Sequence, residues 1–521
     1  MKPALAIVGS GIVGAAIAHT LSRRGYRVDV FEKGPEYPYP HAKQFSERIQ
    51  FMYENPLYEA SKDIDTVTVS GDYVWHPERE RHLVVGGSAT QWSAITLRMR
   101  PADFRTKSRY GYGEDWPLSY EDLEPYYCKG EAHLGVSGTD ADNPFAPRRS
   151  RPFPLPPFEL SYHDRLLADT LRPRGIRLHT TPQARTRIPY EERAGCQNFG
   201  VCKFCPIGAR YSPTYHLLDA LKTGRCQLHH DVSVRRLVMD KSGRGRALVY
   251  QPNDGSKERE HAADVIVLAA GTVESVRLLL LSTVGGNPGI GSAGDHVGRH
   301  FTFHHLWAGG CHYRLPVYPN RFGGFTAQSH QFLDHPSRGK RGALKVEVGS
   351  QTPFHEGRVT KWGSESEIME QLRPRLHWRR IILSAESHPS AEKYVRLSEK
   401  RDRFGDPYAH IHYRSSDFDH ENERFALEVF NLLAEASGSD ERVFSQDTGL
   451  LYSGGHHMGG CRMGRNVRDS VVDQYGRLHG SSNVFVTGGC TFVGSSGAVN
   501  PTLTMVALAL RTAEFIGDQL S

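Results

Sequence analysis

Three cysteines within ten positions of one another have a spacing that suggests metal chemistry. Cys196, Cys202 and Cys205 are spaced C-x5-C-x2-C and are followed by PIGA. Proline and glycine are common near iron–sulfur ligands, and three thiolates without an evident fourth suit a three-iron four-sulfur cluster. Two alternatives stay open: a zinc site that adds His216 or an outside residue, and a loop of buried free thiols without a metal.

Two adjacent histidines near the C-terminal end offer acid–base chemistry. His456 and His457 stand in HHMGG, and a neutral imidazole, with an unperturbed pKa of about 6.5, accepts a proton near neutral pH. Oxidation of an alcohol by hydride removal needs such a base, because the hydroxyl proton must leave as well. Asn500 follows in GAVNPTLT, where Asn before Pro501 is typical of a helix N-cap. Three further histidines are candidates to reach the same pocket: His304, His305 and His388.

The N-terminal segment predicts the elements that could position such groups. ALAIVGSGIVGAAIAHTLSRRGYRVDVFEK, from residue 4, reads as strand, glycine turn, helix and strand. Its glycines, Gly9, Gly11 and Gly14, spell G-x-G-x-x-G, which permits a tight turn and close approach to a pyrophosphate. Glu32 lies 18 positions after Gly14 and can accept hydrogen bonds from adenosine ribose hydroxyls. We therefore predict a dinucleotide-binding unit, and Glu32 disfavours a ribose 2′-phosphate because two anions would meet.

Three later segments extend this pattern along the chain. VVGGSATQW contains Gly86 and Gly87, DVIVLAAGTVESVRLLLLS turns at Gly271, and NVFVTGGCTFVGSSGAVNPTLTMVALALRTAEFIG closes the sequence. In this order and spacing they resemble the glucose–methanol–choline (GMC) family of FAD oxidoreductases over nearly the whole chain. HHMGGCRMG and GAVNPTLT look like the catalytic end of its pyranose-oxidase-like and bacterial sugar-dehydrogenase branches.

The resemblance implies a fold, a reaction and two catalytic residues. The expected fold is α/β and α+β: a Rossmann-like FAD-binding domain with an interleaved substrate domain built on an antiparallel sheet with helices. The expected reaction oxidises a hydroxyl of a sugar, glycoside or sugar-like polyol, including aminosugars, by hydride transfer to flavin N5. His457, directly before MGG, is implied to be the base, with His456 as the alternative, and Asn500 is implied to position the substrate oxygen.

The FAD is expected to be bound without a covalent link. Pyranose oxidases carry a flavin-linked His in STHW, whereas the corresponding ATQW has Gln91, whose amide cannot form that bond. The expected FAD contacts are Gly9, Gly11, Gly14, Glu32, Gly86, Gly87, Ser88, Gln91, Trp92, Ser93, Val234, Gly271, Gly488, Asn500 and Thr502.

The cysteine stretch is similar to the motif of bacterial FAD-dependent glucose, gluconate and fructose dehydrogenases, in which an iron–sulfur cluster passes electrons from flavin to an acceptor. Their last spacing is one residue longer. The acceptor here could be oxygen, a quinone or a cytochrome. The alternative function is a flavin and iron–sulfur electron-transfer or redox module without alcohol oxidation, which would need neither His457 nor Asn500.

The FAD motifs are separated by stretches that match the family less well, which predicts a discontinuous domain. Strand-like runs such as GALKVEVGSQ and AHIHYRSS fit an antiparallel substrate sheet. The expected organisation is FAD-binding residues 1–104, substrate or insertion residues 105–189, FAD-binding residues 190–300 with the cysteine motif, substrate residues 301–439, and FAD-binding residues 440–521 with the catalytic residues.

Composition excludes several classes of protein. The 521 residues are 38% hydrophobic and 23% charged, which is typical of a folded globular chain. A net charge of +6 without a basic, aromatic-interleaved run argues against nucleic acid as a partner. No apolar run reaches the roughly 18 residues of a membrane span. The other cysteines are scattered, which favours a reducing, cytoplasmic location.

Overall fold

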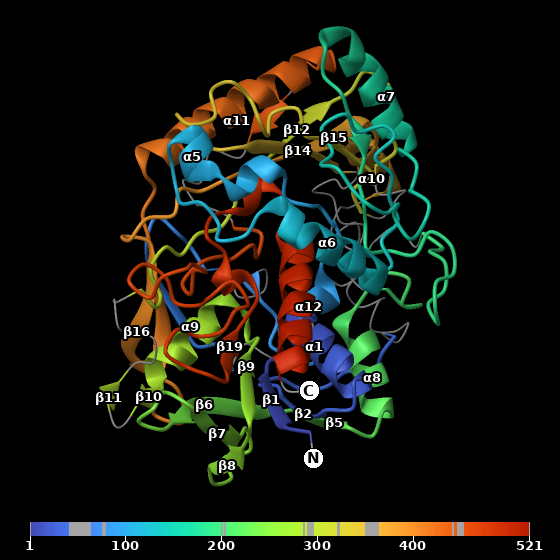
Figure 1. Cartoon of the computed structure of the whole chain (residues 1–521). Helices are drawn as coiled ribbons and strands as arrows, with labels where there is room; N and C mark the ends of the chain where they lie inside the picture. The colour runs from blue at the N-terminus through green and yellow to red at the C-terminus, as the bar shows by residue number, and fades with distance from the viewer. Residues whose placement is uncertain are drawn as a thin grey trace.

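The computed structural model describes residues 2–40, 64–75, 80–198, 202, 205–284, 287–288, 296–319, 324–349, 364–439, 442–444 and 453–519. Figure 1 shows two layers: a lower one that holds both termini, and an upper one in which helix α11 (Asp417–Ala436) covers a sheet. No helix among the described residues is both long enough and apolar enough to span a bilayer.

A parallel five-stranded sheet forms the centre of the lower layer. Its order is β19 (Val484–Val486), β9 (Val265–Leu268), β1 (Ala4–Val8), β2 (Arg27–Phe31) and β5 (Cys226–His229). Neighbouring strands pair in parallel, so the sheet joins the start, middle and end of the chain. Helix α1 (Ile12–Arg23) packs between α8 (Pro213–Lys222) and α12 (Thr502–Gln519). The Rossmann-like part of the predicted fold is confirmed.

Two smaller sheets flank this layer. One has the order β11 (Asn287–Pro288), β10 (Thr283–Val284), β6 (Val232–Met239), β7 (Gly245–Pro252) and β8 (Arg259–Ala262). The other has the order β16 (Tyr394–Arg401), β17 (Pro407–Tyr413) and β3 (Val67–Gly71). Helix α9 (Gly271–Leu281) packs against both.

The upper layer is a six-stranded antiparallel sheet. Its order is β18 (Arg442–Phe444), β12 (His305–His312), β15 (Trp378–Ala385), β14 (Leu344–Gly349), β13 (Ala327–Ser329) and β4 (His179–Thr180). Side chains alternate along β14: Leu344, Val346 and Val348 join the core beneath α11, so Lys345 and Glu347 face the other way. Lys345 and Glu347 therefore lie on the face of the sheet that is turned away from α11.

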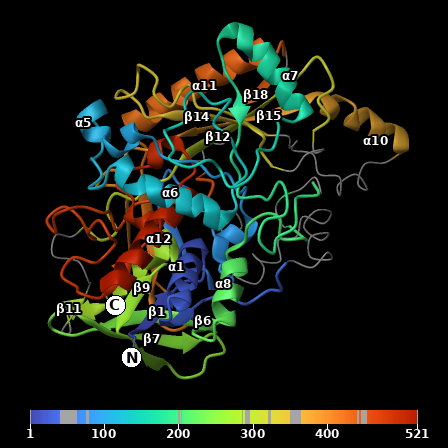
Figure 2. The same cartoon turned by 45° about the vertical axis from the view of Figure 1, so that its right-hand side comes forward.

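A further long helix packs against α12. In Figure 2, α6 (Tyr120–Leu134) crosses next to α12, against which it packs. Within the described residues, the other helical elements are α5 (Thr106–Tyr110), α7 (Tyr162–Leu171), α10 (Glu365–Leu372), and the 3₁₀ turns η2 (Gly87–Gln91), η3 (Pro101–Phe104), η4 (Arg172–Arg174), η6 (Pro374–His377), η7 (Gly489–Thr491) and η8 (Ser496–Ala498).

Candidate active site and cofactor cavity

A cavity of about 510 Å³ lies between the two layers. Most residues expected to contact FAD line it: Gly9, Gly11, Glu32, Gly87, Ser88, Gln91, Trp92, Ser93, Val234, Gly271, Gly488, Asn500 and Thr502. Gly14 and Gly86 are not among the lining residues. A Cβ on Gly14 would stand 1.9 Å from the Gly9 carbonyl oxygen, so this glycine allows α1 to pack closely on the turn.

The glycine turn after β1 leaves room and donors for a phosphate. Gly9 has φ +100° and a Cβ there would lie 2.5 Å from the Ala269 carbonyl oxygen, whereas a Cβ on Gly11 would meet nothing within 4 Å. Helix α1 begins after Gly11 without a side-chain cap, so its first backbone N–H groups remain available. A helix N-terminus of this kind attracts phosphate oxygens.

Glu32 stands at the end of β2, on the cavity wall. Its Oε2 accepts hydrogen bonds from the backbone N (3.0 Å) and Oγ (2.7 Å) of Ser10, and its Oε1 accepts from the Gly34 N at 3.0 Å. Burial raises the pKa of this carboxyl, and these hydrogen bonds oppose the rise. Together with the turn, this fits the adenosine half of a dinucleotide such as FAD.

His456, on the cavity wall, is connected to a buried histidine behind it. The Nε2 of His304 lies 2.8 Å from the Ser495 carbonyl oxygen, and its Nδ1 lies 2.9 Å from the Nδ1 of His456. Burial lowers the pKa of His304 to about 3, so this ring is neutral. Enclosure by the protein also holds the pKa of His456 well below its ordinary value.

Asn500 is held from the opposite side by a buried lysine. Its Oδ1 accepts a hydrogen bond from the Nζ of Lys345, which also pairs with Glu347 Oε1 at 2.5 Å. Because the ammonium can only donate, the amide oxygen must face Lys345. The Nδ2 group then faces His456, whose Nε2 lies 3.4 Å away.

These contacts determine the tautomer of His456. The Ser495 carbonyl can only accept, so His304 carries its proton on Nε2 and accepts on Nδ1. His456 must therefore carry its proton on Nδ1, which leaves the Nε2 lone pair facing the Asn500 amide. A neutral imidazole on a cavity wall whose Nε2 carries no proton is arranged to accept one.

His457 has different partners. Its Nε2 lies 3.1 Å from Glu80 Oε2 and 3.1 Å from the Tyr73 hydroxyl, and its ring stacks on Trp75. Nε2 of His457 thus faces a carboxylate and a hydroxyl group rather than Asn500. The geometry therefore groups Asn500 with His456, although the sequence had led us to expect His457 in that place.

The other three candidate histidines do not line the cavity. His304 acts behind His456, whereas His305 lies 2.6 Å from the Tyr413 hydroxyl. The backbone N of His388 donates to Asp419. Several charged cavity residues were not foreseen from the sequence, among them Lys33, Glu80, Arg81, Glu274, Glu347 and Arg380. The alternation along GALKVEVGSQ could have indicated Glu347, since it places two charges on the face opposite three apolar residues.

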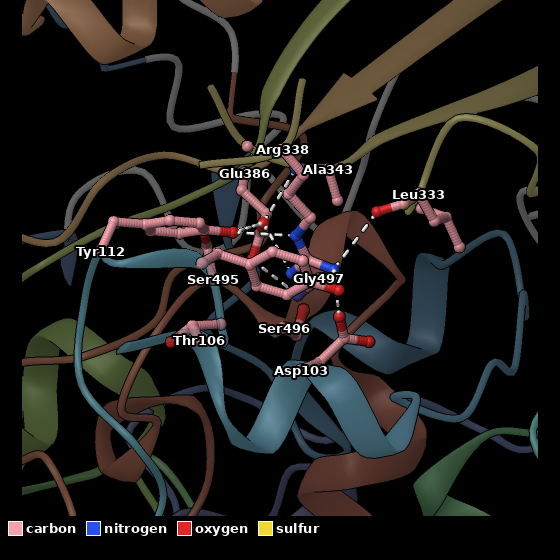
Figure 3. A network of polar contacts seen from close by, with 12 residues as sticks. Asp103, Thr106, Tyr112, Leu333, Arg338, Ala343, Glu386, Ser495, Ser496 and Gly497 are labelled. Atoms are coloured by element: carbon pink, nitrogen blue, oxygen red, sulfur yellow. Dashed lines mark hydrogen bonds and ion pairs between the residues drawn. The ribbon is translucent and has the colours of Figure 1, made fainter. Parts of the chain in front are cut away.

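Figure 3 shows a buried ion network around the turn that precedes Asn500. Arg338 donates to Asp103 Oδ1 at 2.8 Å and to Glu386 Oε2 at 3.0 Å, and Glu386 Oε1 accepts from the Gly497 N at 3.1 Å. Gly497 has φ +62°, and a Cβ there would lie 2.3 Å from the Asp103 carboxyl carbon. The network therefore holds the turn whose Ser495 carbonyl sets the His304 proton.

The three motif cysteines are half-buried free thiols. Arg185 donates to the Sγ of Cys202 at 3.2 Å, and the Arg210 N lies 3.5 Å from the Sγ of Cys205. The sulfur atoms of these three described residues, Cys196 included, do not all lie within 4.8 Å of one another. The three described thiols are therefore not grouped closely enough to bind a single metal ion together.

His216, the fourth ligand of the zinc alternative, lies elsewhere. It forms a group with His19 and His133 whose ligand atoms all lie within 4.8 Å, and its Nδ1 is 2.9 Å from the Tyr211 hydroxyl. The rings of His133 and His216 stack 3.7 Å apart at 15°. Each imidazole binds a metal in its own plane, so two nearly parallel stacked rings cannot both face one ion. No metal site is assigned here.

Comparison with protein families identifies the class. A GMC oxidoreductase N-terminal model matches residues 181–306, the C-terminal model of that family matches residues 389–509, and an NAD(P)-binding Rossmann-like domain matches residues 7–38. With the cavity and its glycine turn, these matches show that the chain belongs to the GMC oxidoreductase family, and they support FAD as its cofactor.

Several characterised proteins are similar over nearly their whole length. The fructose dehydrogenase large subunit of Gluconobacter japonicus is 29% identical, covering 99% of this chain and 97% of that protein. The 2-methyl-1,2-propanediol dehydrogenase of Mycolicibacterium austroafricanum is 28% identical, covering 99% and 95%. The 6'''-hydroxyparomomycin C oxidase of Streptomyces lividus is 28% identical, covering 99% and 91%.

Solved structures support the fold. Pyridoxine 4-oxidase from Mesorbium loti superimposes with a TM-score of 0.68 over 99% of both chains, at 19% identity. A variant of formate oxidase from Aspergillus oryzae superimposes with a TM-score of 0.68 at 14% identity, covering 100% of this chain and 99% of that one.

Proposed function

We propose that this protein oxidises a hydroxyl group of a sugar, glycoside or other polyol, aminosugars included, to a carbonyl. The observation that carries the proposal is the pair formed by His456 Nε2 and Asn500 Nδ2, 3.4 Å apart on the wall of the FAD cavity. The similar proteins support the substrate class, because they are named for fructose, a diol and an aminoglycoside.

In this mechanism the substrate hydroxyl binds between His456 and Asn500. The Asn500 amide donates a hydrogen bond to the alcohol oxygen, and the Nε2 lone pair of His456 accepts the hydroxyl proton. Bound FAD would supply the two-electron acceptor for the hydride that leaves the carbon bearing this hydroxyl. The low pKa of His456 keeps this base unprotonated before the reaction and lets it release the proton afterwards.

His456 replaces His457 as the proposed base. His457 Nε2 faces Glu80 and the Tyr73 hydroxyl, and we propose that it shapes the cavity rather than accepting the substrate proton. We also propose that FAD is bound without a covalent link, since Gln91 lines the cavity in place of a histidine. No electron-transfer step is assigned to Cys196, Cys202 or Cys205, and iron and sulfide analysis after anaerobic purification would test a cluster there.

The test is anaerobic reduction of the bound flavin by a panel of sugars, glycosides, diols and aminosugars. His456→Ala is expected to retain FAD and to slow reduction by at least about 100-fold, the size of a general-base contribution. His457→Ala should have a smaller effect. If His457→Ala is the more damaging change, His456 is not the base. If no panel member bleaches the flavin, the protein is the electron-transfer module instead.

A further inference from the structure

The inner face of the six-stranded sheet forms the part of the cavity wall opposite the FAD motifs. Five residues from this side line the cavity: Leu306, Phe325, Glu347, Arg380 and Ile382. None of them belongs to the expected FAD contacts. Leu306, Arg380 and Ile382 come from β12 and β15, and Glu347 comes from β14. This wall is therefore available to a substrate bound next to the cofactor.

Glu347 has one carboxylate oxygen that faces the cavity. Its side chain is only 8% exposed, and Oε1 pairs with the Lys345 Nζ at 2.5 Å. Its Oε2 has no hydrogen-bond partner within the described parts of the chain, yet it is not among the fully buried atoms that lack partners. Since Glu347 lines the cavity, this oxygen opens into it. A largely buried carboxylate with an open oxygen is suited to accept a hydrogen bond from a ligand.

Arg380 has an interaction of its own, and it also lines the cavity with several N–H donors near this acceptor. In the β14–β15 register, Glu347 lies opposite Ile382 and Gly349 lies opposite Arg380. Glu347 and Arg380 are thus diagonal neighbours on one face of the sheet, within reach of each other's long side chains. An acceptor and a donor side by side match a hydroxyl group, which both donates and accepts.

We propose that Glu347 and Arg380 form a substrate subsite that binds a second hydroxyl of a polyol, apart from the hydroxyl being oxidised. The inference rests on the proposed function and names a selectivity determinant for it. Glu347 is connected to Asn500 through Lys345, two hydrogen bonds away, so the second hydroxyl lies on a carbon close to the reacting one. An alcohol without this hydroxyl leaves the carboxylate oxygen unsatisfied when it displaces water.

The test compares flavin reduction by paired substrates in wild type and Glu347→Gln. The pairs are 1,2-propanediol with 1-propanol, and the best sugar of the panel with its monodeoxy derivatives. In wild type, loss of the second hydroxyl should lower kcat/KM by about 10- to 150-fold, the range of a charge-assisted hydrogen bond. In Glu347→Gln this ratio should shrink by at least about fivefold, because the variant has already lost that contact.

Controls separate the subsite from a structural effect. Glu399→Gln, exposed on β16, should leave all ratios unchanged. If Glu347→Gln does not retain FAD, Glu347→Asp replaces it as the test variant. It keeps the charge beside Lys345 but shortens the side chain, and it should shift the kcat/KM ratios in the same direction. If Glu347→Gln lowers kcat/KM equally for both substrates of each pair, the subsite is overturned while the proposed function stands. Absence of flavin reduction by every panel member in wild type overturns both.

Discussion

Replacing Lys345 by methionine removes the ammonium group and leaves a side chain of similar length. Lys345 is fully buried, and Glu347 is 8% exposed, so the change leaves an unpaired carboxylate in the protein. Breaking a buried ion pair by removing one partner costs about 3–5 kcal/mol, so the free energy of unfolding should fall by that amount. Lys400→Met, an exposed position on β16, serves as the matched control.

The same variant frees the amide of Asn500 to rotate. Its Oδ1 would lose a charged hydrogen bond of about 1.5–3 kcal/mol, and a reduction step that depends on this orientation should slow by about 10- to 150-fold. Stopped-flow absorbance of the flavin under anaerobic conditions measures this rate.

The double variant Lys345→Met with Asn500→Ala tests whether Lys345 influences flavin reduction through Asn500. If Lys345 acts through Asn500, the double variant should reduce the flavin no more slowly than Asn500→Ala alone. Independent, multiplying losses in the two single variants would refute the reasoning, because Lys345 would then influence the reaction by another path.

Three further outcomes are expected. Burial lowers the pKa of His304 to about 3 and those of His163 and His305 to about 4. Because the unfolded chain binds protons at these histidines below about pH 6.5, each should lower the free energy of unfolding by about 1.4 kcal/mol per pH unit between pH 6.5 and its folded pKa. In His304→Asn, the free energy of unfolding measured with denaturant should therefore fall less steeply with pH between pH 6.5 and 5. Acid precipitation should release FAD into the supernatant; yellow colour retained on the pellet would contradict a non-covalent link. Gly497→Ala should lower the free energy of unfolding by at least about 1–3 kcal/mol and slow flavin reduction. Gly494→Ala is the control, because a Cβ there meets nothing within 4 Å, and it should have neither effect. Equal melting temperatures for the two variants would count against strain in this turn.

The local sequence was sufficient to predict the dinucleotide-binding unit. Strand β1, the glycine turn, helix α1 and strand β2 lie within 30 residues, and each depends on contacts between near neighbours in sequence. A turn that needs φ +100° at Gly9 and close packing at Gly14 is visible as glycine in the sequence, because no other residue fits. The family and most residues of the FAD wall follow from the same kind of local pattern.

The choice between His456 and His457 had no such local signal. Adjacent residues in an extended segment point in different directions, and which direction meets Asn500 depends on the parts of the chain that surround them. Glu80 lies more than 370 positions before His457, and Lys345 lies 155 positions before Asn500. Only the folded arrangement brings these groups within hydrogen-bonding distance.

The sequence by itself therefore indicated the family and the cofactor-binding turn, and it offered His456, His457 and Asn500 as candidates, because short-range backbone constraints leave a mark in residue type and spacing. The tertiary structure decided which histidine is paired with Asn500, which nitrogen of His456 holds the proton, and which charged side chains line the cavity. These features arise from long-range contacts, and a hydrogen bond between residues far apart in the chain imposes no spacing that the sequence could display.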